Sequence, residues 1–465
     1  MSYPRTLGEL KESGYRQRSV RQELRENLIA RLRRGDPLFP EMVGYADSVV
    51  PAVEHALLAG HDMVFLGERG QGKTRMIRAL VELLDAEIPV VEGSEVNDDP
   101  FAPVSLPARE RVAELGDRTP VAWLPREQRY GEKLATPDVT IADLLGEIDP
   151  IRVAEGRYLA DESVIHYGLV PRTNRGIFCI NELPDLSEKV QVGLFNVMEE
   201  RDFQVKGFKV RLPLDILIVA SANPEDYTRR GRIITPLKDR YQAQIRTHYP
   251  ETRPLEIEVM EQERREHAGV CPIFVPDYLR EIIAELTLLA RRSPDISQVS
   301  GVSVRASIAN YETLIAAAER RALRLDEAEA VPRVSDLESL VASTGGKIEP
   351  EYGGTDQDYA GIFDKLLRQA VKTVFDERLD AEGLDDVVAA FEDGWKVEVG
   401  SLLPASDYVE GLDRIPGLKP AVVSLEAAGS AGQTAAAIEF VLEGLHLSNR
   451  LNKDVQGQSI RYGGA

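Results

Sequence analysis

Apolar residues follow two different patterns along the chain, and the first is confined to residues 38–250. There, short runs of consecutive apolar residues alternate with stretches in which apolar side chains recur every three or four positions. The runs Met63–Leu66, 177–180 and 216–221 have the length and composition of buried strands. Because such strands alternate with helices, this region is predicted to fold as an α/β domain on a parallel sheet.

From residue 251 onward the pattern is mainly helical. Apolar side chains recur at helical spacing over 276–292 and 304–324, and helix-like segments interrupted by glycine continue to about residue 375. Proline and glycine interrupt the stretch after residue 400, and a last helix is predicted over about 431–445. The chain is thus predicted to have four parts: a basic helical segment (1–37), the α/β domain (38–250), a helical domain (251–375) and an acidic, mostly helical extension (376–465).

The charge of the chain narrows the range of its partners. Its 465 residues include 56 Lys and Arg and 77 Asp and Glu, a formal net charge of −21. Nucleic acid and anionic membranes are bound through cationic surface, so neither is expected as the main partner. The basic segment 1–35 is predicted to dock on the acidic body of the chain itself. The acidic stretch 376–398 is predicted to be a solvated helical surface, with a docking face for a basic partner as the alternative.

Several other classes of protein are excluded. Two cysteines, Cys179 and Cys271, are too few for a disulfide framework or a cysteine-rich zinc module, and the six histidines lack the spacing of metal-binding motifs. The apolar runs are shorter than the roughly 18 residues of a membrane span, and the N-terminal residues lack the apolar core of a signal peptide. A cytoplasmic protein that does not insert into membranes is therefore expected.

The clearest chemical signal is a glycine-rich loop between a predicted strand and a predicted helix. Residues 67–74 fit the phosphate-loop pattern G-x-x-x-x-G-K-[ST]. Glycines let the backbone curl so that its N–H groups point at phosphate oxygens, and the following helix adds the positive end of its dipole. Lys73 is predicted to contact the β- and γ-phosphates of ATP, and Thr74 to bind Mg²⁺. The residues expected at the nucleotide are Gly67, Glu68, Arg69, Gly70, Gln71, Gly72, Lys73 and Thr74.

A second predicted strand ends in two polar residues. The apolar run 177–180 is followed by Asn181 and Glu182, at the end of the strand where open α/β sheets bind ligands. The usual pair in phosphate-loop proteins is Asp-Glu. The Asn181 carbonyl can still accept a hydrogen bond from water bound to Mg²⁺, but it brings no negative charge. Glu182 is predicted to polarise the attacking water. Nucleotide binding is therefore expected, and the rate of hydrolysis is left open.

Further segments, taken in order, give the chain a resemblance to AAA+ ATPases of the magnesium-chelatase I subunit and MoxR clade. The segments that carry it are 39–45, 168–176, 199–212 (a predicted hairpin), 216–224 (ILIVASANP), 236–241 (PLKDRY) and 302–306 (VSVRA). The resemblance covers about residues 38–330 and implies a P-loop AAA+ core with a parallel sheet, followed by an α-helical lid. Tyr241 replaces the usual phenylalanine, and the part beyond about residue 380 has no counterpart.

The resemblance also implies roles for individual residues. Val43 and Gly44 would lie near the adenine, and Asn223 would orient the attacking water or touch the γ-phosphate. Arg240 would be the arginine finger that reaches the γ-phosphate of a neighbouring subunit, and Arg305 would reach the phosphates from the lid. A finger that acts on a neighbour requires an oligomer, and contacts that close give a ring. The alternatives to Arg240 are Arg229, Arg230 and Arg232.

The function that the resemblance implies is remodelling of a protein partner, driven by ATP hydrolysis in a homo-oligomeric ring. Clade members typically work with a partner that bears a von Willebrand factor A-like domain. One alternative is the ATPase subunit of magnesium chelatase, which drives metal insertion into protoporphyrin. Another is a nucleotide-binding scaffold with low turnover, suggested by Asn181. A third is an AAA+ transcriptional regulator, although the G-A-F-T-G-A loop of such regulators is not found in the sequence.

Overall fold

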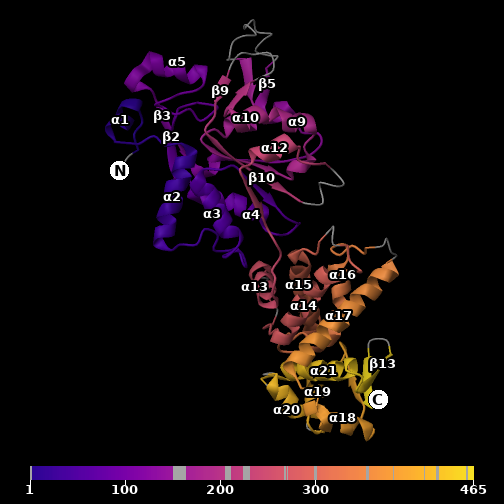
Figure 1. Cartoon of the computed structure of the whole chain (residues 1–465). Helices are drawn as coiled ribbons and strands as arrows, with labels where there is room; N and C mark the ends of the chain where they lie inside the picture. The colour runs from indigo at the N-terminus through magenta and orange to yellow at the C-terminus, as the bar shows by residue number, and fades with distance from the viewer. Residues whose placement is uncertain are drawn as a thin grey trace. The chain divides into compact units, whose positions relative to one another are not determined.

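The computed structural model of the chain forms two compact units, Met1–His248 and Tyr249–Ala465 (Figure 1). The residues that the structure describes are 3–149, 164–204, 211–223, 231–265, 269, 271–297, 301–351, 356–380, 382–412, 414–425, 429–456 and 459–464. The N-terminal unit holds the predicted basic segment and nearly all of the predicted α/β domain. The C-terminal unit holds the segments 251–375 and 376–465.

A five-stranded parallel sheet forms the centre of the N-terminal unit, as the alternation of strands and helices predicts. The strand order is β11-β1-β10-β7-β4, and each neighbouring pair is parallel. The three predicted strands are confirmed as β1, β7 and β10. The strands of this sheet are β1 (Met63–Leu66), β4 (Tyr130–Leu134), β7 (Gly176–Asn181), β10 (Ile216–Ala222) and β11 (Ala243–Arg246).

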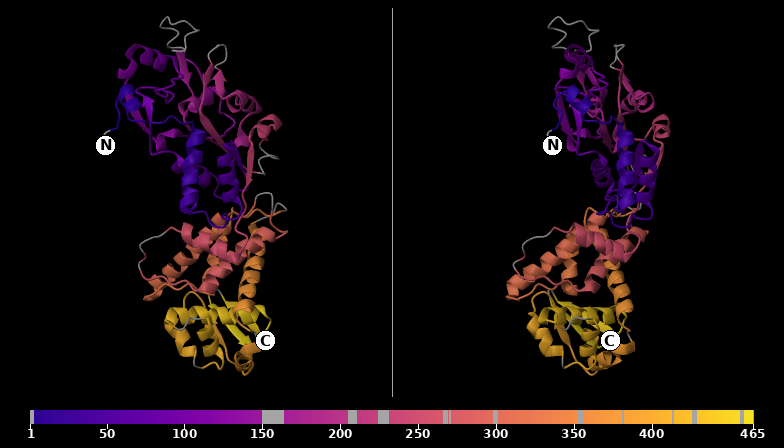
Figure 2. Two further views of the ribbon diagram at one scale, coloured as in Figure 1. Left: turned by 60° about the vertical axis from the view of Figure 1, so that its left-hand side comes forward. Right: turned by 90° about the vertical axis from the view of Figure 1, so that its left-hand side faces the viewer.

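Helices cover both faces of this sheet, which explains why its central strands read as unbroken apolar runs. Phe65 and Val219 pack on one face, in a cluster with residues of α2 (Val20–Arg34), α3 (Val49–Ala59) and α4 (Lys73–Ala79). Val64 and Ile218 pack on the other face, with residues of α9 (Glu188–Gly193), α10 (Phe195–Glu199) and α12 (Thr235–Arg240). Figures 1 and 2 show the two helical layers. This packing holds the carboxyl ends of β1, β10 and β7 side by side.

Shorter elements complete the N-terminal unit. Strands β2 and β3 pair antiparallel, as do β5 with β6 and β8 with β9. The last pair, in which Asp202 lies opposite Pro213, agrees with the hairpin predicted over 199–212. The shorter elements are α1 (Leu7–Glu12), η1 (Leu80–Leu83), β2 (Glu87–Val91), α5 (Leu106–Leu115), η2 (Gly116–Arg118), β3 (Val121–Pro125), η3 (Arg126–Arg129), α6 (Ile141–Leu145), β5 (Gly146–Ile148), β6 (Ile165–Tyr167), α8 (Leu169–Arg172), η5 (Leu183–Asp185), β8 (Asp202–Gln204) and β9 (Arg211–Pro213).

The basic segment near the N-terminus forms helix α2, which docks on its own unit. Ser19 caps the helix by accepting a hydrogen bond from the backbone of Gln22. Leu24 and Leu28 are buried against the sheet layer. On the polar side, the guanidinium of Arg21 lies 2.7 Å from the carboxylate of buried Asp62. The predicted docking of this segment on acidic groups of the same chain is confirmed.

The C-terminal unit contains one continuous hydrophobic cluster that runs from Met260 to Tyr462, so the segments 251–375 and 376–465 share a core. The predicted helices over 276–292, 304–324 and 431–445 are confirmed as α14, α15 and α21. The helical elements are α13 (Arg253–Glu263), α14 (Asp277–Arg292), α15 (Val304–Leu325), η6 (Val334–Ser339), α16 (Leu340–Thr344), α17 (Asp356–Arg378), η7 (Glu382–Leu384), α18 (Asp385–Glu392), α19 (Ala405–Leu412), α20 (Leu418–Ser424) and α21 (Ala431–Leu447).

A small antiparallel sheet, which the sequence did not predict, completes the C-terminal unit. Its strand order is β12-β14-β13. Val399 lies opposite Ile460 in one ladder, and Lys453 lies opposite Tyr462 in the other. The strands are β12 (Val397–Val399), β13 (Leu451–Gln456) and β14 (Ser459–Gly464).

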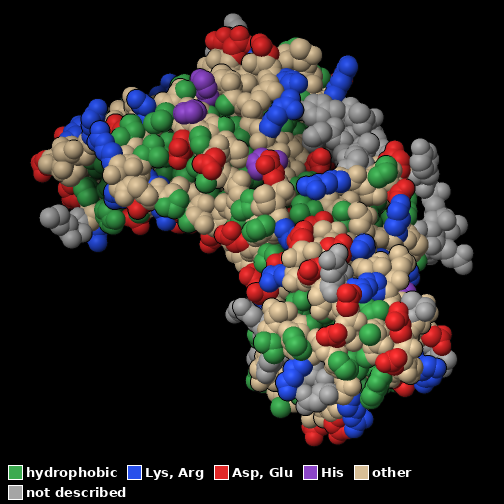
Figure 3. All heavy atoms as spheres, turned by 60° about the horizontal axis from the view of Figure 1, so that its bottom comes forward, with side chains coloured by type: hydrophobic (Ala, Val, Ile, Leu, Met, Phe, Trp, Pro, Cys, Tyr) green, Lys and Arg blue, Asp and Glu red, His purple; other side chains and the backbone are tan. Residues whose placement is uncertain are grey.

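The acidic stretch 376–398 lies largely on helices, and several of its carboxylates pair with arginines from other parts of the same unit. Glu377 lies 2.5 Å from Arg253, and Asp385 forms an ion pair with Arg450. On the face that Figure 3 shows, acidic and basic side chains are interspersed. Some of the negative charge of this stretch is therefore balanced locally, and such exposed pairs add little to stability.

Helices α17 and α21 pack together where Gly444 leaves room for Phe375. A Cβ atom at residue 444 would lie 1.9 Å from Cδ2 of Phe375. Gly444→Ala is expected to lower the free energy of unfolding by about 1–3 kcal/mol, because the added methyl overpacks the core. The control is Gly361→Ala on α17, where nothing lies within 4 Å; this change is expected to stabilise by about 0.5–1 kcal/mol. Urea denaturation measures both, and equal effects would contradict the packing argument.

Candidate nucleotide-binding site

The glycine-rich loop connects β1 to α4. Two of its glycines lie where a Cβ atom would come too close to neighbouring side chains. A Cβ atom at Gly67 would lie 1.9 Å from Oγ1 of Thr247 and 2.2 Å from Oε1 of Gln71. Gly72 has a φ of 71°, and a Cβ atom there would lie 2.4 Å from Cε of Met42. A side chain at Gly67 would therefore clash with Thr247 and Gln71, and the positive φ at Gly72 disfavours any side chain there. The sequence motif is thus a requirement of this backbone path.

Lys73 joins the loop to the end of strand β10. Its ammonium donates hydrogen bonds to the carbonyl oxygens of Gly67 at 2.5 Å and Glu68 at 2.7 Å, and to Oδ1 of Asn223 at 2.7 Å. The side chain is buried. A buried cation held in the curl of the loop is placed to neutralise phosphate oxygens there.

Asn223 in turn contacts Glu182 at the end of the neighbouring strand. Its Nδ2 donates to Oε2 of Glu182 at 2.6 Å. Glu182 adopts the left-handed backbone region, with a φ of 55°, and its amide donates to Oγ of Ser221 at 3.2 Å. A non-glycine residue in this region costs about 1–3 kcal/mol and recurs at functional sites. The structure thus brings together Lys73, Asn223 and Glu182, three of the residues predicted from the sequence.

The two residues predicted to bind Mg²⁺ are also adjacent. The Thr74 hydroxyl lies 3.5 Å from Oδ1 of Asn181, which also accepts a hydrogen bond from Ser221 at 3.1 Å. On the other side, Nδ2 of Asn181 donates to Oε1 of Glu132 at 2.5 Å. Hydrogen bonds from Arg78 lower the pKa of Glu132, so this carboxylate is ionised near neutral pH.

Tyr45 ties the predicted adenine segment to the loop. It follows Val43 and Gly44, and its hydroxyl lies 2.8 Å from the carbonyl oxygens of both Gln71 and His248. Burial raises the pKa of Tyr45 well above its usual value, so the hydroxyl is a hydrogen-bond donor at all ordinary pH values. The contact with Gln71 ties the residue that follows Val43 and Gly44 to the phosphate loop.

Arg240 is the last residue of α12 and is held by its own subunit. It forms an ion pair with Glu199, donates to the carbonyl of Pro236 at 2.8 Å, and its guanidinium lies 4.5 Å from the ring centre of Phe195. These contacts come from α10 and α12 rather than from the phosphate loop.

The other predicted arginines lie in different settings. Arg305 is exposed in the first turn of α15 in the C-terminal unit, where its backbone amide donates to the hydroxyl of Ser303. Arg232 is exposed and lies 3.7 Å from Glu188. Arg229 and Arg230 lie outside the described residues.

Sequence reasoning missed several residues that shape the site. Ser221 stands two positions before Asn223 in a quoted motif, and Tyr45 directly follows Gly44, so proximity to known motifs was an available signal. Thr247 follows the edge strand β11, which was not predicted. Glu132 lies on β4, which has no run of apolar residues by which a strand could be recognised.

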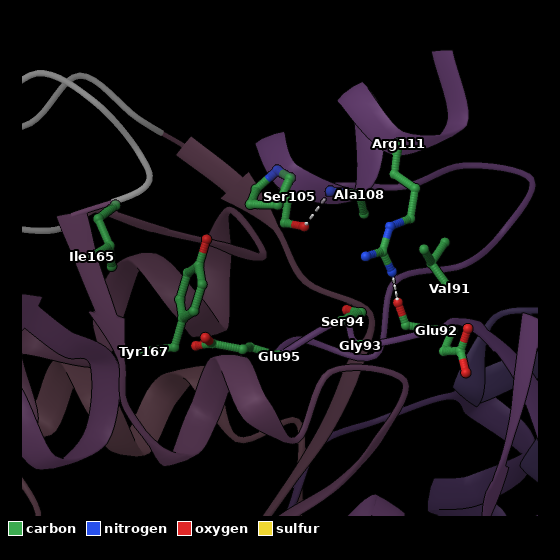
Figure 4. A pocket seen from close by; sticks show the side chains of 11 residues that line it. Val91, Glu92, Gly93, Ser94, Glu95, Ser105, Ala108, Arg111, Ile165 and Tyr167 are labelled. Carbon is green, nitrogen blue, oxygen red and sulfur yellow. Dashed lines mark hydrogen bonds between the residues drawn. The ribbon is translucent and has the colours of Figure 1, made fainter. Parts of the chain in front are cut away.

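A separate cavity of about 140 Å³ lies in the N-terminal unit (Figure 4). Its lining includes Glu95, Arg111 and Tyr167 but no residue of the phosphate loop. The Arg111 guanidinium is engaged with the backbone carbonyl of Glu92. The cavity is therefore not part of the nucleotide site.

The described part of the chain shows neither a membrane span nor a cluster of metal ligands. None of the helices described there is both long and apolar enough to cross a membrane. Within the same residues, no group of three or more His, Cys, Asp or Glu side chains could hold a metal ion. Mg²⁺ is commonly held by one or two protein ligands together with substrate phosphates, and Thr74 and Asn181 fit that mode of binding.

Comparisons with known proteins agree with the geometry. A family model described as the Sigma-54 interaction domain matches residues 154–241. Magnesium-chelatase subunit ChlI of Anabaena variabilis is 29% identical over 219 residues, which are 46% of this chain and 61% of that protein. Subunit ChlI-1 of Arabidopsis thaliana is 25% identical over 207 residues, 44% of this chain and 46% of that protein. This chain thus spans about half the length of these relatives.

Among solved structures, a complex between subunits BchI and BchD of magnesium chelatase contains a chain that is 20% identical to this one. The match covers 72% of this chain and 95% of that chain, with a TM-score of 0.36. A TM-score this low does not establish a shared fold over the whole chain.

The parallel sheet, the phosphate loop and the polar ends of β7 and β10 form the arrangement typical of a P-loop nucleotide-binding core. The matches to chelatase subunits, together with the motif order from residue 39 to residue 306, make the class more specific. Over a little under half of its length, the chain is similar to magnesium-chelatase I subunits.

Proposed function

We propose that this chain binds ATP with Mg²⁺ and hydrolyses it in a homo-oligomeric ring, and that the cycle remodels a protein partner. The observation that carries the proposal is the hydrogen-bonded series Lys73, Asn223 and Glu182 at the adjacent carboxyl ends of β1, β10 and β7. The series combines a cation that can bind phosphate, Lys73, with a carboxylate that can polarise water, Glu182.

Each residue of the series has a chemical task in the proposed reaction. Backbone N–H groups of the loop bind the phosphates, and Lys73 exchanges its carbonyl contacts for β- and γ-phosphate oxygens. Glu182 orients and polarises the attacking water, and Asn223 holds the Glu182 carboxylate in place. Thr74 and Asn181 would hold Mg²⁺, which neutralises phosphate charge when bound.

Two arginines have proposed roles that involve more than the N-terminal unit of one subunit: Arg240 and Arg305. Arg240 completes the site of a neighbouring subunit, because a finger stabilises the charge that spreads over the transferred phosphoryl group. Arg305 contacts the phosphates from the helical lid and so couples the nucleotide to movement. Both assignments rest on the motif order; Arg305 is exposed, whereas Arg240 is half-buried against Glu199 and Phe195.

The partner is proposed from the resemblance to the chelatase and MoxR clade, whose members typically work with a protein that bears a von Willebrand factor A-like domain. The matched relatives are named as magnesium-chelatase subunits, and one solved complex pairs BchI with BchD. We propose a partner with a von Willebrand factor A-like domain for this chain. Service as the ATPase subunit of a magnesium chelatase is the more specific alternative.

Two other functions have a specific observation in their favour. Asn181, which lacks the charge of an aspartate, favours a nucleotide-binding scaffold with low turnover. The match to the Sigma-54 interaction domain favours a transcriptional regulator. Duplex DNA binding that weakens with salt would support the regulator, and no binding at low salt would exclude it.

ATP binding and phosphate release by the purified protein test the main proposal. Lys73→Ala is expected to weaken ATP binding, because it removes the cation at the phosphates. Glu182→Gln is expected to retain ATP binding and to lower turnover by at least about 10²-fold, because general base catalysis is lost. Fluorescence titration with an ATP analogue and a phosphate-release assay measure the two effects. Binding without turnover in the native protein, with its partner present, would instead support the scaffold.

A further inference from the structure

The amide of Asn181 presents two chemically opposite ends to its surroundings. Its Oδ1 accepts hydrogen bonds and can bind a cation or its water, whereas its Nδ2 only donates. Asn181 can therefore contribute to binding Mg²⁺ only when its Oδ1 faces Thr74. An aspartate at this position would not have this constraint, since both of its oxygens accept.

The described contacts select one orientation of this amide. Nδ2 donates to Oε1 of Glu132 at 2.5 Å, from the adjacent strand β4. Oδ1 accepts from Ser221 at 3.1 Å and lies 3.5 Å from the Thr74 hydroxyl. Cys179 also lies on the Oδ1 side, with its sulfur at 3.4 Å. The hydroxyls of Ser221 and Thr74 can accept as well as donate, but the Glu132 carboxylate can only accept, so the reversed amide would set its oxygen against a carboxylate.

Glu132 is suited to this task because its described partners are all donors. Arg78 donates to it through Nε and Nη2, both at 2.8 Å, and the Tyr130 hydroxyl donates at 2.9 Å. With Asn181 this makes four hydrogen bonds into one carboxylate. A glutamine at 132 would have to turn an N–H group toward one of these donors.

We propose that Glu132 is a positioning residue for the Mg²⁺ site: it holds the Asn181 amide with Oδ1 toward Thr74. It also supplies, from strand β4, a carboxylate that position 181 lacks. This inference rests on the proposed binding of ATP with Mg²⁺. Asn181 and Glu132 thus form a coupled pair. The amide stands at 181 and the carboxylate at 132, the reverse of a pair with aspartate at 181 and glutamine at 132.

The coupling predicts how substitutions combine. Asn181→Asp alone brings two carboxylates into contact, which is unfavourable. Glu132→Gln alone places an N–H group against donors in either orientation: against Asn181 and Nη2 of Arg78, or against Nε of Arg78 and the Tyr130 hydroxyl. The four hydrogen bonds that hold the Asn181 amide in place can then no longer all form. In the double variant, the glutamine donates to the aspartate and the pairing is restored with the carboxylate at 181.

Two measurements on the full chain test the coupling. In nucleotide-free protein, each single change is expected to lower the melting temperature by roughly 2–4 °C, and the double variant to recover most of the loss. In the second measurement, a fluorescent ATP analogue is titrated at rising Mg²⁺. Glu132→Gln is expected to raise the Mg²⁺ concentration for half-maximal enhancement of binding by about 10-fold or more, as loss of a ligand's orienting partner usually does.

The control is Glu127→Gln, which removes an exposed carboxylate paired with Arg126 on the same unit; no change is expected in either measurement. Equal Mg²⁺ requirements for Glu132→Gln and Glu127→Gln, or additive melting effects in the double variant, would overturn the proposal. If the native protein binds no ATP, the proposed function fails and the role at Mg²⁺ fails with it. The melting measurements would still show whether Glu132 and Asn181 are coupled.

Discussion

Replacement of Arg240 by alanine is expected to lower ATP turnover by about 10³-fold or more, the effect typical of losing an arginine finger. ATP binding and assembly are expected to persist, because the described contacts of Arg240 are to Glu199, Pro236 and Phe195 rather than to the loop. Phosphate release at saturating ATP measures the turnover, and size-exclusion chromatography with ATP measures assembly. Lys238→Ala, an exposed cation on the same helix, is the matched control and is expected to turn over ATP normally.

A mixing experiment decides whether Arg240 acts on a neighbour. Arg240→Ala subunits retain Glu182, and Glu182→Gln subunits retain Arg240, so each inactive variant carries what the other lacks. In rings mixed at equal amounts, about one quarter of the interfaces would combine an intact carboxylate with an intact finger. Turnover is therefore expected to return on mixing. No recovery in mixed rings, or a native protein that stays monomeric with ATP, would show that Arg240 is not a finger in trans. A loss seen with Arg232→Ala instead would transfer the role to that residue.

The elements predicted correctly from the sequence are those that a short stretch of residues identifies by itself. Strands β1, β7 and β10 are buried on both faces, so each is a run of apolar residues that can be recognised without its neighbours. The phosphate loop follows from the chemistry of its glycines, one of which leaves no room for a side chain beside Thr247. Asn223 and Glu182 were predicted separately, and the parallel pairing of β7 with β10 brings them to hydrogen-bonding distance.

The elements that the sequence did not reveal depend on distant parts of the chain. Strand β4 is an edge strand that is only partly buried and mostly polar, so it has no apolar run. Strands β13 and β14 contain polar residues and glycines, and they are set by pairing with each other and with β12. The contact between Glu132 and Asn181 joins residues 49 positions apart. Such contacts arise from register and packing, which no short motif encodes.

Removal of either partner of the buried ion pair between Glu23 and Arg129 is expected to have the largest effect on stability. Arg129 donates to the two carboxylate oxygens of Glu23 at 2.7 and 2.6 Å, and also to the carbonyl of Arg175 at 2.8 Å. Both side chains are almost fully buried, with 1% and 4% of their surface exposed. Glu23→Ala or Arg129→Ala is expected to lower the free energy of unfolding by about 3–5 kcal/mol, because the remaining charge is left buried without its partner.

Urea denaturation of the single variants and of the double variant Glu23→Leu/Arg129→Met tests this expectation. The double variant removes both charges and keeps the volume, so it is expected to be more stable than either single variant. Asp117→Ala, which breaks an exposed pair with Lys11, is expected to cost less than about 1 kcal/mol. Equal losses for Asp117→Ala and Glu23→Ala would contradict the argument.

Since Glu23 lies on α2 and Arg129 directly precedes β4, this pair also joins the basic N-terminal helix to the strand that carries Glu132. A weakened pair is therefore expected to raise the Mg²⁺ requirement for ATP binding as well.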